Sequence, residues 1–260
     1  MRITNVGHAV FAATMIALGI MGLVQGHFDP VWDPGFEKMP AREVLVYLCA
    51  VIRLACGVGL LFRRTAAPAA RLLLAFASLW LLLFRVPGMF ISFTVDTWWA
   101  ACMTAVMVAG AWVLYVWLAT DWDRQRLGFA SGNSGLRIAR ALYGMALIPF
   151  GIAHFLYLRH TAELVPGWLP GHVGWAYFTG GALITAGVAL VAGVWARLAA
   201  TLSALEIGLF LLLVWVPIVA AGSRDAADWG ETVVSLALMA GSWVVADSYR
   251  GVPWLAVGKR

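Results

Sequence analysis

Charge is scarce in this sequence: only 12% of its 260 residues are Asp, Glu, Lys or Arg, whereas 62% are hydrophobic. Soluble domains carry about twice that share of charged residues, so too few polar side chains are present to cover a water-exposed surface. The composition therefore predicts a polytopic membrane protein. Its net charge of +5 suggests anionic lipid headgroups, and no nucleic acid, as the neighbour of the basic side.

Cysteine is scarce as well. Cys49, Cys56 and Cys102 all fall in apolar stretches, and the first two would lie about 10 Å apart along one helix, beyond the reach of a disulfide. No CxxC motif is present, so we expect packing residues. The sequence also contains no Walker loop, nucleophile elbow, HExxH helix or calcium loop, and we assign no metal site.

Apolar stretches, in contrast, are abundant. A membrane-spanning helix needs about 20 mainly apolar residues, and a chain in hydrocarbon must satisfy its own backbone groups. We therefore expect eight transmembrane helices in an all-α fold. They lie near residues 7–26, 44–62, 68–92, 98–118, 136–156, 173–192, 197–221 and 228–247.

An internal repeat organises these stretches. The segment "MPAREVLVYLCAVIRLACGVGLL" aligns with "LPGHVGWAYFTGGALITAGVALV", which begins 130 residues later. We predict a first four-helix repeat at 1–119, a polar linker at 120–135 and a second repeat at 136–260. Because four is even, both repeats have the same orientation, and a pseudo-twofold axis runs along the membrane normal.

Arginine and lysine residues mark the two sides of the membrane. With eight helices, both termini lie on one side, and that side collects Arg2, Arg63, Arg64, Arg71, Arg124, Arg126, Arg137, Arg140, Arg197, Arg250, Lys259 and Arg260. The other side holds Lys38, Arg42, Arg159 and Arg224. The positive-inside rule predicts a multi-pass protein of a bacterial-type cytoplasmic (inner) membrane with cytoplasmic termini.

The loop motifs resemble a known family. "GIAHFLYLRHTAELVPGWLPGHVGWAYFTGGALITAGVAL" and "GHFDPVWDPGFEKMPAREVLVYL" are similar to the two halves of duplicated, eight-helix DoxX family proteins. The resemblance implies two pseudo-symmetric DoxX-like four-helix bundles. It also implies a link to membrane redox chemistry, because the family is named after a subunit of a thiosulfate:quinone oxidoreductase. The paired cysteines of some redox-linked members have no counterpart here.

Two histidines occupy equivalent places in this motif. His27 and His154 lie at the outer ends of the first and fifth helices. If the pseudo-axis brings them together, they could serve as metal or haem ligands or as a proton relay. Alternatively, each is an interfacial histidine that bonds a loop carbonyl.

Tryptophans gather near the outer boundary. Trp32, Trp98, Trp99, Trp168, Trp175 and Trp229 fit an aromatic belt at the membrane interface. A second interpretation is an aromatic-walled pocket for a quinone or another flat lipophile. In that pocket, residues 160–172 form an ordered cap, Trp168 points inward and His172 is exposed.

Three charged residues fall inside predicted spans. Arg53, Arg85 and Glu206 align in the repeat with Leu183, Trp215 and Phe76. A charge at mid-bilayer costs at least about 2.5 kcal/mol on insertion scales, so each is either a functional candidate or one member of a structural pair. Because the depths of Arg53 and Glu206 agree, we predict that these two residues pair. Arg85 lies about two turns nearer the outside, and we predict that it lines a cavity beneath Trp168.

Three classes of function stay open. The chain could be a membrane subunit or quinone-binding component of a redox system, with a soluble or membrane oxidoreductase as partner. It could instead carry or bind a small hydrophobic molecule. It could also be an intramembrane enzyme that uses Glu206 or a histidine as acid or base.

Overall fold

The structure, a computed structural model, describes residues 5–35 and 40–258. In these residues, eight helices are long and apolar enough to cross a membrane, and no strand is formed. They are α1 (Val6–Gln25), α2 (Arg42–Leu61), α3 (Ala66–Trp80) continued by η1 (Leu81–Arg85) and α4 (Val86–Ile91), α5 (Val95–Leu118), α8 (Asn133–Leu156), α10 (His172–Ala192), α11 (Ala196–Phe210) continued by η2 (Leu211–Trp215) and α12 (Val216–Ala220), and α13 (Ala226–Asp247). The chain is an all-α polytopic membrane protein, as predicted. Arg2, Lys38, Lys259 and Arg260, which enter the charge count, lie outside the described residues.

Helix boundaries in the second half follow those in the first at the offset of the aligned sequences. α2 and α10 begin 130 residues apart, and so do α3 and α11. The short π-helical turns η1 and η2 also begin and end 130 residues apart. Sequence similarity at this offset therefore corresponds to similarity of backbone conformation, down to an irregular turn.

Proline accounts for that irregular turn. Pro87 and Pro217 have no N–H to donate, and a proline ring clashes with the carbonyl four residues earlier in a regular helix. In each half the turn before the proline widens, and the N–H of Val86 or Val216 bonds the carbonyl of Leu81 or Leu211, five residues back. Each wide turn lies within one continuous membrane-spanning helix.

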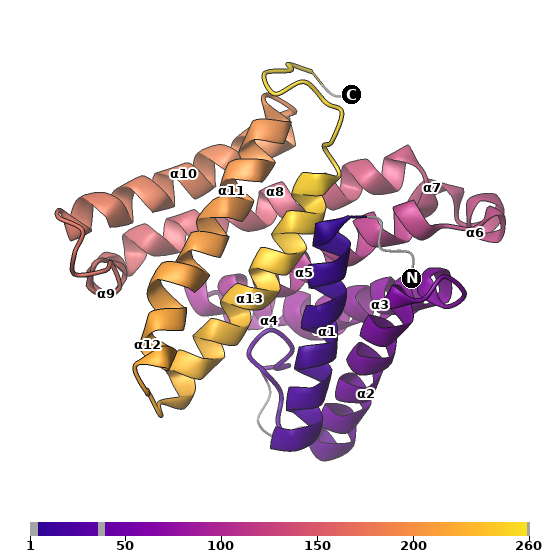
Figure 1. The fold of residues 1–260 in the computed structure, drawn as a ribbon, viewed down its shortest axis with the longest axis horizontal. Coiled ribbons are helices and arrows are strands. Elements are labelled where there is room, and N and C mark those ends of the chain that lie inside the picture. The colour runs from indigo at the N-terminus through magenta and orange to yellow at the C-terminus, as the bar shows by residue number, and fades with distance from the viewer. Residues whose placement is uncertain (1–4, 36–39, 259–260) are drawn as a thin grey trace.

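The helices of each half pack in the same order. α1 packs on α2, α2 on α3 and α3 on α5, just as α8 packs on α10, α10 on α11 and α11 on α13. Between the halves, α5 packs on α8, α13 packs on α1, and α5 contacts α13. Exchange of the halves maps these contacts onto themselves, so the two halves share one packing order. In Figure 1, the short helices α6 (Asp121–Arg126) and α7 (Gly128–Ser131) lie at the right, whereas α9 (Leu158–Glu163) lies at the left and α12 at the lower left.

Glycine allows the closest helix pair of the second half to form. A Cβ atom built on Gly144 would lie 3.0 Å from the carbonyl oxygen of Gly187, and one built on Gly187 would lie 2.6 Å from that of Gly144. Gly151 and Gly180 face each other in the same reciprocal way. Small residues at such crossings let backbones approach, and dispersion then holds the helices together in lipid.

Large apolar side chains cover the outer surface of the helices. Leu82, Leu83, Phe90 and Phe178 are each more than half exposed. A soluble protein rarely exposes so large an apolar area, whereas a lipid bilayer covers it without cost. The exposed surface thus agrees with the length and composition of the helices.

The linker between the halves is ordered and anchored to the first half. Asp123 of α6 is fully buried and accepts bonds from Arg71 Nε and Nη2 at 2.8 and 3.0 Å, from Tyr115 at 3.1 Å and from the hydroxyl of Thr120 at 2.7 Å. Burial alone raises the pKa of this carboxyl. The hydrogen bonds from Arg71, Thr120 and Tyr115 outweigh burial and hold the pKa of Asp123 well below its usual range.

We expect Asp123→Asn to destabilise the protein near neutral pH by about 1–3 kcal/mol, since it removes a bidentate charge-assisted pair. A carboxyl with a lowered folded-state pKa stabilises the fold above its unfolded pKa of about 4 and loses that contribution as the pH falls through the folded value. The difference in melting temperature between Asp123→Asn and wild type should therefore shrink below about pH 4. Asp121→Asn, an exposed change in the same turn, serves as control. A difference that stays constant down to pH 3 contradicts the assignment.

Candidate functional site

A short segment after α1 turns back into the first half. Helix α1 ends at Gln25, and Gly26 takes a left-handed conformation with φ of 68°, which glycine adopts at little cost. The following residues form what we call the inserted segment (residues 28–32). Four of its side chains, Phe28, Asp29, Val31 and Trp32, are buried.

A buried ion pair joins this segment to helix α2. Arg53 Nη1 donates to Asp29 Oδ2, and the two side chains are 0% and 4% exposed. Arg53 Nε also donates to the carbonyl of Cys49 at 3.2 Å. The predicted pair between Arg53 and Glu206 is wrong, because the inserted segment carries a nearer carboxylate into the bundle.

Arg85 holds the backbone of the same segment. Its Nη2 donates to the carbonyl oxygens of Pro30 at 2.8 Å and Val31 at 3.1 Å. Thr104 of α5 donates to the same Val31 carbonyl at 3.0 Å. Arg85 is thus engaged by the inserted segment, and the cavity predicted for it beneath Trp168 is not its environment.

Trp32 fills the space between helices α2 and α3. Its side chain is 0% exposed and stacks on Phe76, with ring centroids 5.0 Å apart. Its edge meets Trp80 at 6.3 Å, and the guanidinium carbon of Arg53 lies 5.7 Å from its centroid. Trp32 is therefore a core residue, and its assignment to the aromatic belt is wrong. In the first half, these charged side chains and aromatic rings therefore hold the inserted segment in place.

In the second half, a groove lies between α10 and α11, the helices equivalent to α2 and α3. It has a volume of about 520 Å³ and is mostly apolar. Phe178 and Leu202, which line it, are 65% and 52% exposed, so it opens toward the lipid. Ser203 and Glu206 provide polar atoms along its wall.

Glu206 is the charged residue among those that line this groove. It lies near the middle of the span Ala196–Ala220, and its Oε1 is buried with no hydrogen-bond partner among the described residues. A buried polar atom without a partner costs free energy. The carboxyl group therefore keeps an unused hydrogen-bond acceptor next to the groove.

His154 lies close to this groove and its ring is half-buried. Its Nδ1 lies 2.8 Å from the carbonyl oxygen of Phe150, and its ring stacks on Phe210 of α11 with centroids 5.7 Å apart. Since a carbonyl only accepts hydrogen bonds, Nδ1 carries the hydrogen, and Nε2 of the neutral ring is an acceptor. Gly180 of α10 lies against the Cβ of His154, which places this ring between α10 and α11.

His27 has a different environment from its counterpart. It is exposed, and its Nδ1 lies 3.1 Å from the carbonyl oxygen of Phe28. Each histidine thus bonds a backbone carbonyl, and no contact joins the two rings in the part of the chain that is described. Among those residues there is also no group of three or more His, Cys, Asp or Glu side chains that could hold a metal ion.

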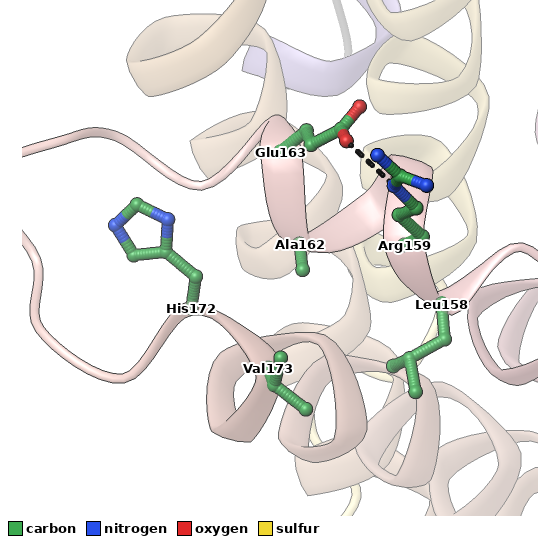
Figure 2. A pocket seen from close by; sticks show the side chains of 6 residues that line it. All are labelled: Leu158, Arg159, Ala162, Glu163, His172 and Val173. Atoms are coloured by element: carbon green, nitrogen blue, oxygen red, sulfur yellow. Dashed lines mark hydrogen bonds and ion pairs between the residues drawn. The ribbon is translucent and has the colours of Figure 1, made fainter.

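The structure of the predicted cap, residues 160–172, differs from the prediction at Trp168. Residues 158–163 form α9, and the chain then reaches α10 through turns, but Trp168 is 71% exposed. The inward orientation predicted for Trp168 is wrong, and His172 is half-buried where an exposed ring was predicted. A hollow of about 370 Å³ lies at this place, and Arg159 pairs with Glu163 at 3.2 Å. Figure 2 shows the side chains that line the hollow and draws no bond between His172 and this pair.

Trp98 and Trp99 are half-buried at the start of α5. Trp98 meets Phe93 with centroids 5.5 Å apart, and Trp99 meets Phe150 of α8 at 4.9 Å. Trp99 therefore packs between the halves. Neither residue lines the α10–α11 groove, so the structure separates them from Glu206.

Sequence reasoning missed Asp29 as the partner of Arg53. Only charged residues inside the predicted spans were considered as partners, and Asp29 lies in a loop, where it precedes the apolar residues Val31 and Trp32. The sequence did contain a signal, namely the apolar residues beside Asp29 in "HFDPVW". An exposed loop rarely combines two aromatic rings and a valine within six residues.

Comparison of the chain with protein-family models, with curated proteins and with solved structures finds no match. The resemblance to the DoxX family stays a prediction that depends on the quoted residues.

Proposed function

We propose that this protein is a DoxX-like membrane component of a redox system and that it binds a quinone or a similar lipophile in the α10–α11 groove. The observation that carries the proposal is the groove itself, a lipid-facing space of about 520 Å³ with a carboxyl group on its wall. Binding sites for small molecules are mainly apolar, with a few polar groups that fix orientation. A quinone combines an apolar tail with a polar head and fits this arrangement.

Orientation and partners form part of the same proposal. The arginines near the chain ends and in the linker favour cytoplasmic termini in a bacterial-type inner membrane. A soluble or membrane oxidoreductase that exchanges electrons with the quinone is the partner that this proposal implies.

Gentle extraction followed by native mass spectrometry tests this proposal. We expect the wild-type protein to retain a quinone. Thr185→Trp should release it, because Thr185 is an exposed residue of the groove wall and an indole fills much of the space. Ala55→Trp places the same side chain at the equivalent exposed position of the first half and should leave retention unchanged.

Two outcomes overturn the proposal. One is a wild-type protein that retains no quinone and binds no added decylubiquinone. The other is equal loss from both tryptophan variants. A different retained lipophile, displaced by Thr185→Trp alone, favours the carrier alternative over the redox one.

A further inference from the structure

The segments that follow the last membrane-spanning helix of each half are equivalent. The linker segment (residues 119–131) follows α5, and the tail segment (residues 249–258) follows α13. The offset of 130 residues aligns the start of the one with the other. Because an even number of spans precedes each segment, both leave the membrane on the same side. In Figure 1, the yellow tail segment runs from the end of α13 to the ends of α10 and α11.

In each half, an arginine of the third membrane-spanning helix stacks on a tryptophan of this segment. The guanidinium carbon of Arg71 lies 4.5 Å from the ring centroid of Trp122. That of Arg197 lies 4.0 Å from the ring centroid of Trp254. Neither the arginines nor the tryptophans occupy aligned positions. The repeat in the sequence therefore does not by itself account for an arginine–tryptophan pair in both halves.

Hydrogen bonds fix the tail segment against the second half. Arg197 Nη1 donates to the carbonyl of Val252 at 2.9 Å, and the N–H of Trp195 donates to the carbonyl of Ala256 at 2.8 Å. Arg197 makes no other hydrogen bond among the described residues, so its Nε and Nη2 keep unused donors. The ring of Trp254 is 46% exposed beside them. A phosphate oxygen can bind this guanidinium while the segment stays in place.

The linker segment has corresponding groups. Arg71 is engaged by Asp123, but a second arginine, Arg126, lies over the other ring, with its guanidinium carbon 5.5 Å from the centroid of Trp122. Arg126 is exposed and has no hydrogen-bond partner in the part of the chain that is described. Trp122 is 48% exposed. Each segment thus combines a half-exposed indole with a guanidinium that has donors to spare.

The surroundings of both segments indicate the headgroup layer of the membrane. Phe129 of the linker is 66% exposed and Leu255 of the tail 64%, next to helices whose apolar side chains face lipid. Such side chains are covered when a segment lies in the membrane interface, which tryptophan also prefers. Exposed arginines outnumber exposed acids on this side among the described residues, where the acid is Asp121 and the arginines are Arg63, Arg64, Arg124, Arg126, Arg137 and Arg250. A basic surface at this depth attracts anionic lipid.

We infer that the linker and tail segments lie in the headgroup layer of the leaflet beside the ends of α5 and α13, where each binds the phosphate of an anionic phospholipid. Arg126 beside Trp122 and Arg197 beside Trp254 donate to the phosphate oxygens. The indole rings lie at the level of the headgroups. The inference does not depend on the quinone groove, because it concerns a different surface and a different lipid.

Fluorescence quenching in nanodiscs tests the position of the segments. The fluorophore NBD is attached to one new cysteine, in Phe129→Cys or in Leu255→Cys, while the three native cysteines are buried. We expect nitroxide on lipid headgroups to quench both labels and iodide in the water to quench neither. Arg159→Cys is the control, since this side chain is 95% exposed, and iodide should quench its label. Iodide quenching at residues 129 and 255 as strong as at residue 159 overturns the inference.

Native mass spectrometry from nanodiscs that contain equal amounts of phosphatidylglycerol and phosphatidylcholine tests the phosphate sites. We expect wild type to retain phosphatidylglycerol in preference. Arg126→Gln and Arg197→Gln should each lower this preference about fivefold, the effect of one arginine near an anionic surface. Arg124→Gln removes the same charge from the same helix, but Arg124 lies over no ring in the described chain, so the preference should change little. Equal losses in Arg124→Gln and Arg126→Gln overturn the inference, as does a wild type without preference.

Discussion

Breaking the Asp29–Arg53 pair from one side is expected to destabilise the protein more than removing both partners. The pair is almost completely buried, so Asp29→Leu leaves a guanidinium in the low-dielectric interior and Arg53→Met leaves a carboxylate there. Loss of one member of a buried pair costs about 3–5 kcal/mol, whereas replacement of both by apolar groups is often close to neutral. The double variant Asp29→Leu/Arg53→Met should therefore be more stable than Arg53→Met alone.

Equilibrium unfolding in one mild detergent compares the four proteins. An exposed pair provides the control: Arg159 and Glu163 are 95% and 63% exposed at their side chains, so Arg159→Met should produce no measurable change. The prediction fails if the two single losses add in the double variant, because additivity means that the partners do not interact. It also fails if Arg53→Met behaves like Arg159→Met.

The helices were predictable because membrane insertion imposes strong and local rules. Length and composition of apolar stretches located all eight candidates, since each span must satisfy its own backbone. The repeat offset carried over to helix boundaries, and even to the wide turns before Pro87 and Pro217. Those turns depend on the missing N–H of proline, which is a property of the residue itself and needs no knowledge of its neighbours.

The partners of the buried charges were not predictable in this way. Matching Arg53 with Glu206 used depth along the helices, but depth does not say which helix faces which. The true partner came from a loop that turns inward at Gly26, and nothing in the hydropathy of a loop reports such a turn. The predicted inward orientation of Trp168 was wrong for a different reason. Proline and glycine indicate a turn but do not indicate the direction in which a side chain in that turn points.

The candidate site also has one part that the sequence predicted and another that it did not. Glu206 and His154 were identified from their type and position, since a carboxyl in a span is costly and a histidine at a helix end is polar. Where each of them lies depends on how α8, α10 and α11 pack. The sequence shows the glycines at these helix crossings but not their contacts. The helix packing that builds the groove is thus the step on which the functional proposals depend.

Gly151→Ala is expected to separate helices α8 and α10. A Cβ atom at Gly151 would overlap the carbonyl oxygen of Gly180 and lie 2.6 Å from Ile184 Cγ1. A backbone carbonyl within a helix cannot rotate away as a side chain can, so the helices must move apart. Overpacking of this kind costs about 1–3 kcal/mol, and in lipid the lost close contact is not replaced by a hydrophobic driving force.

Gly181→Ala is the matched control, because Gly181 adjoins Gly180 on the same helix and a Cβ there meets nothing within 4 Å. This change should be neutral or stabilise the helix by up to about 1 kcal/mol, since alanine has the higher helix propensity. We expect the melting temperature of Gly151→Ala to fall and that of Gly181→Ala to stay level or rise in the same detergent. Because α10 forms one wall of the groove, separation of α8 and α10 should also weaken quinone binding in Gly151→Ala. Equal melting temperatures for the two variants contradict the proposed close approach of the two backbones.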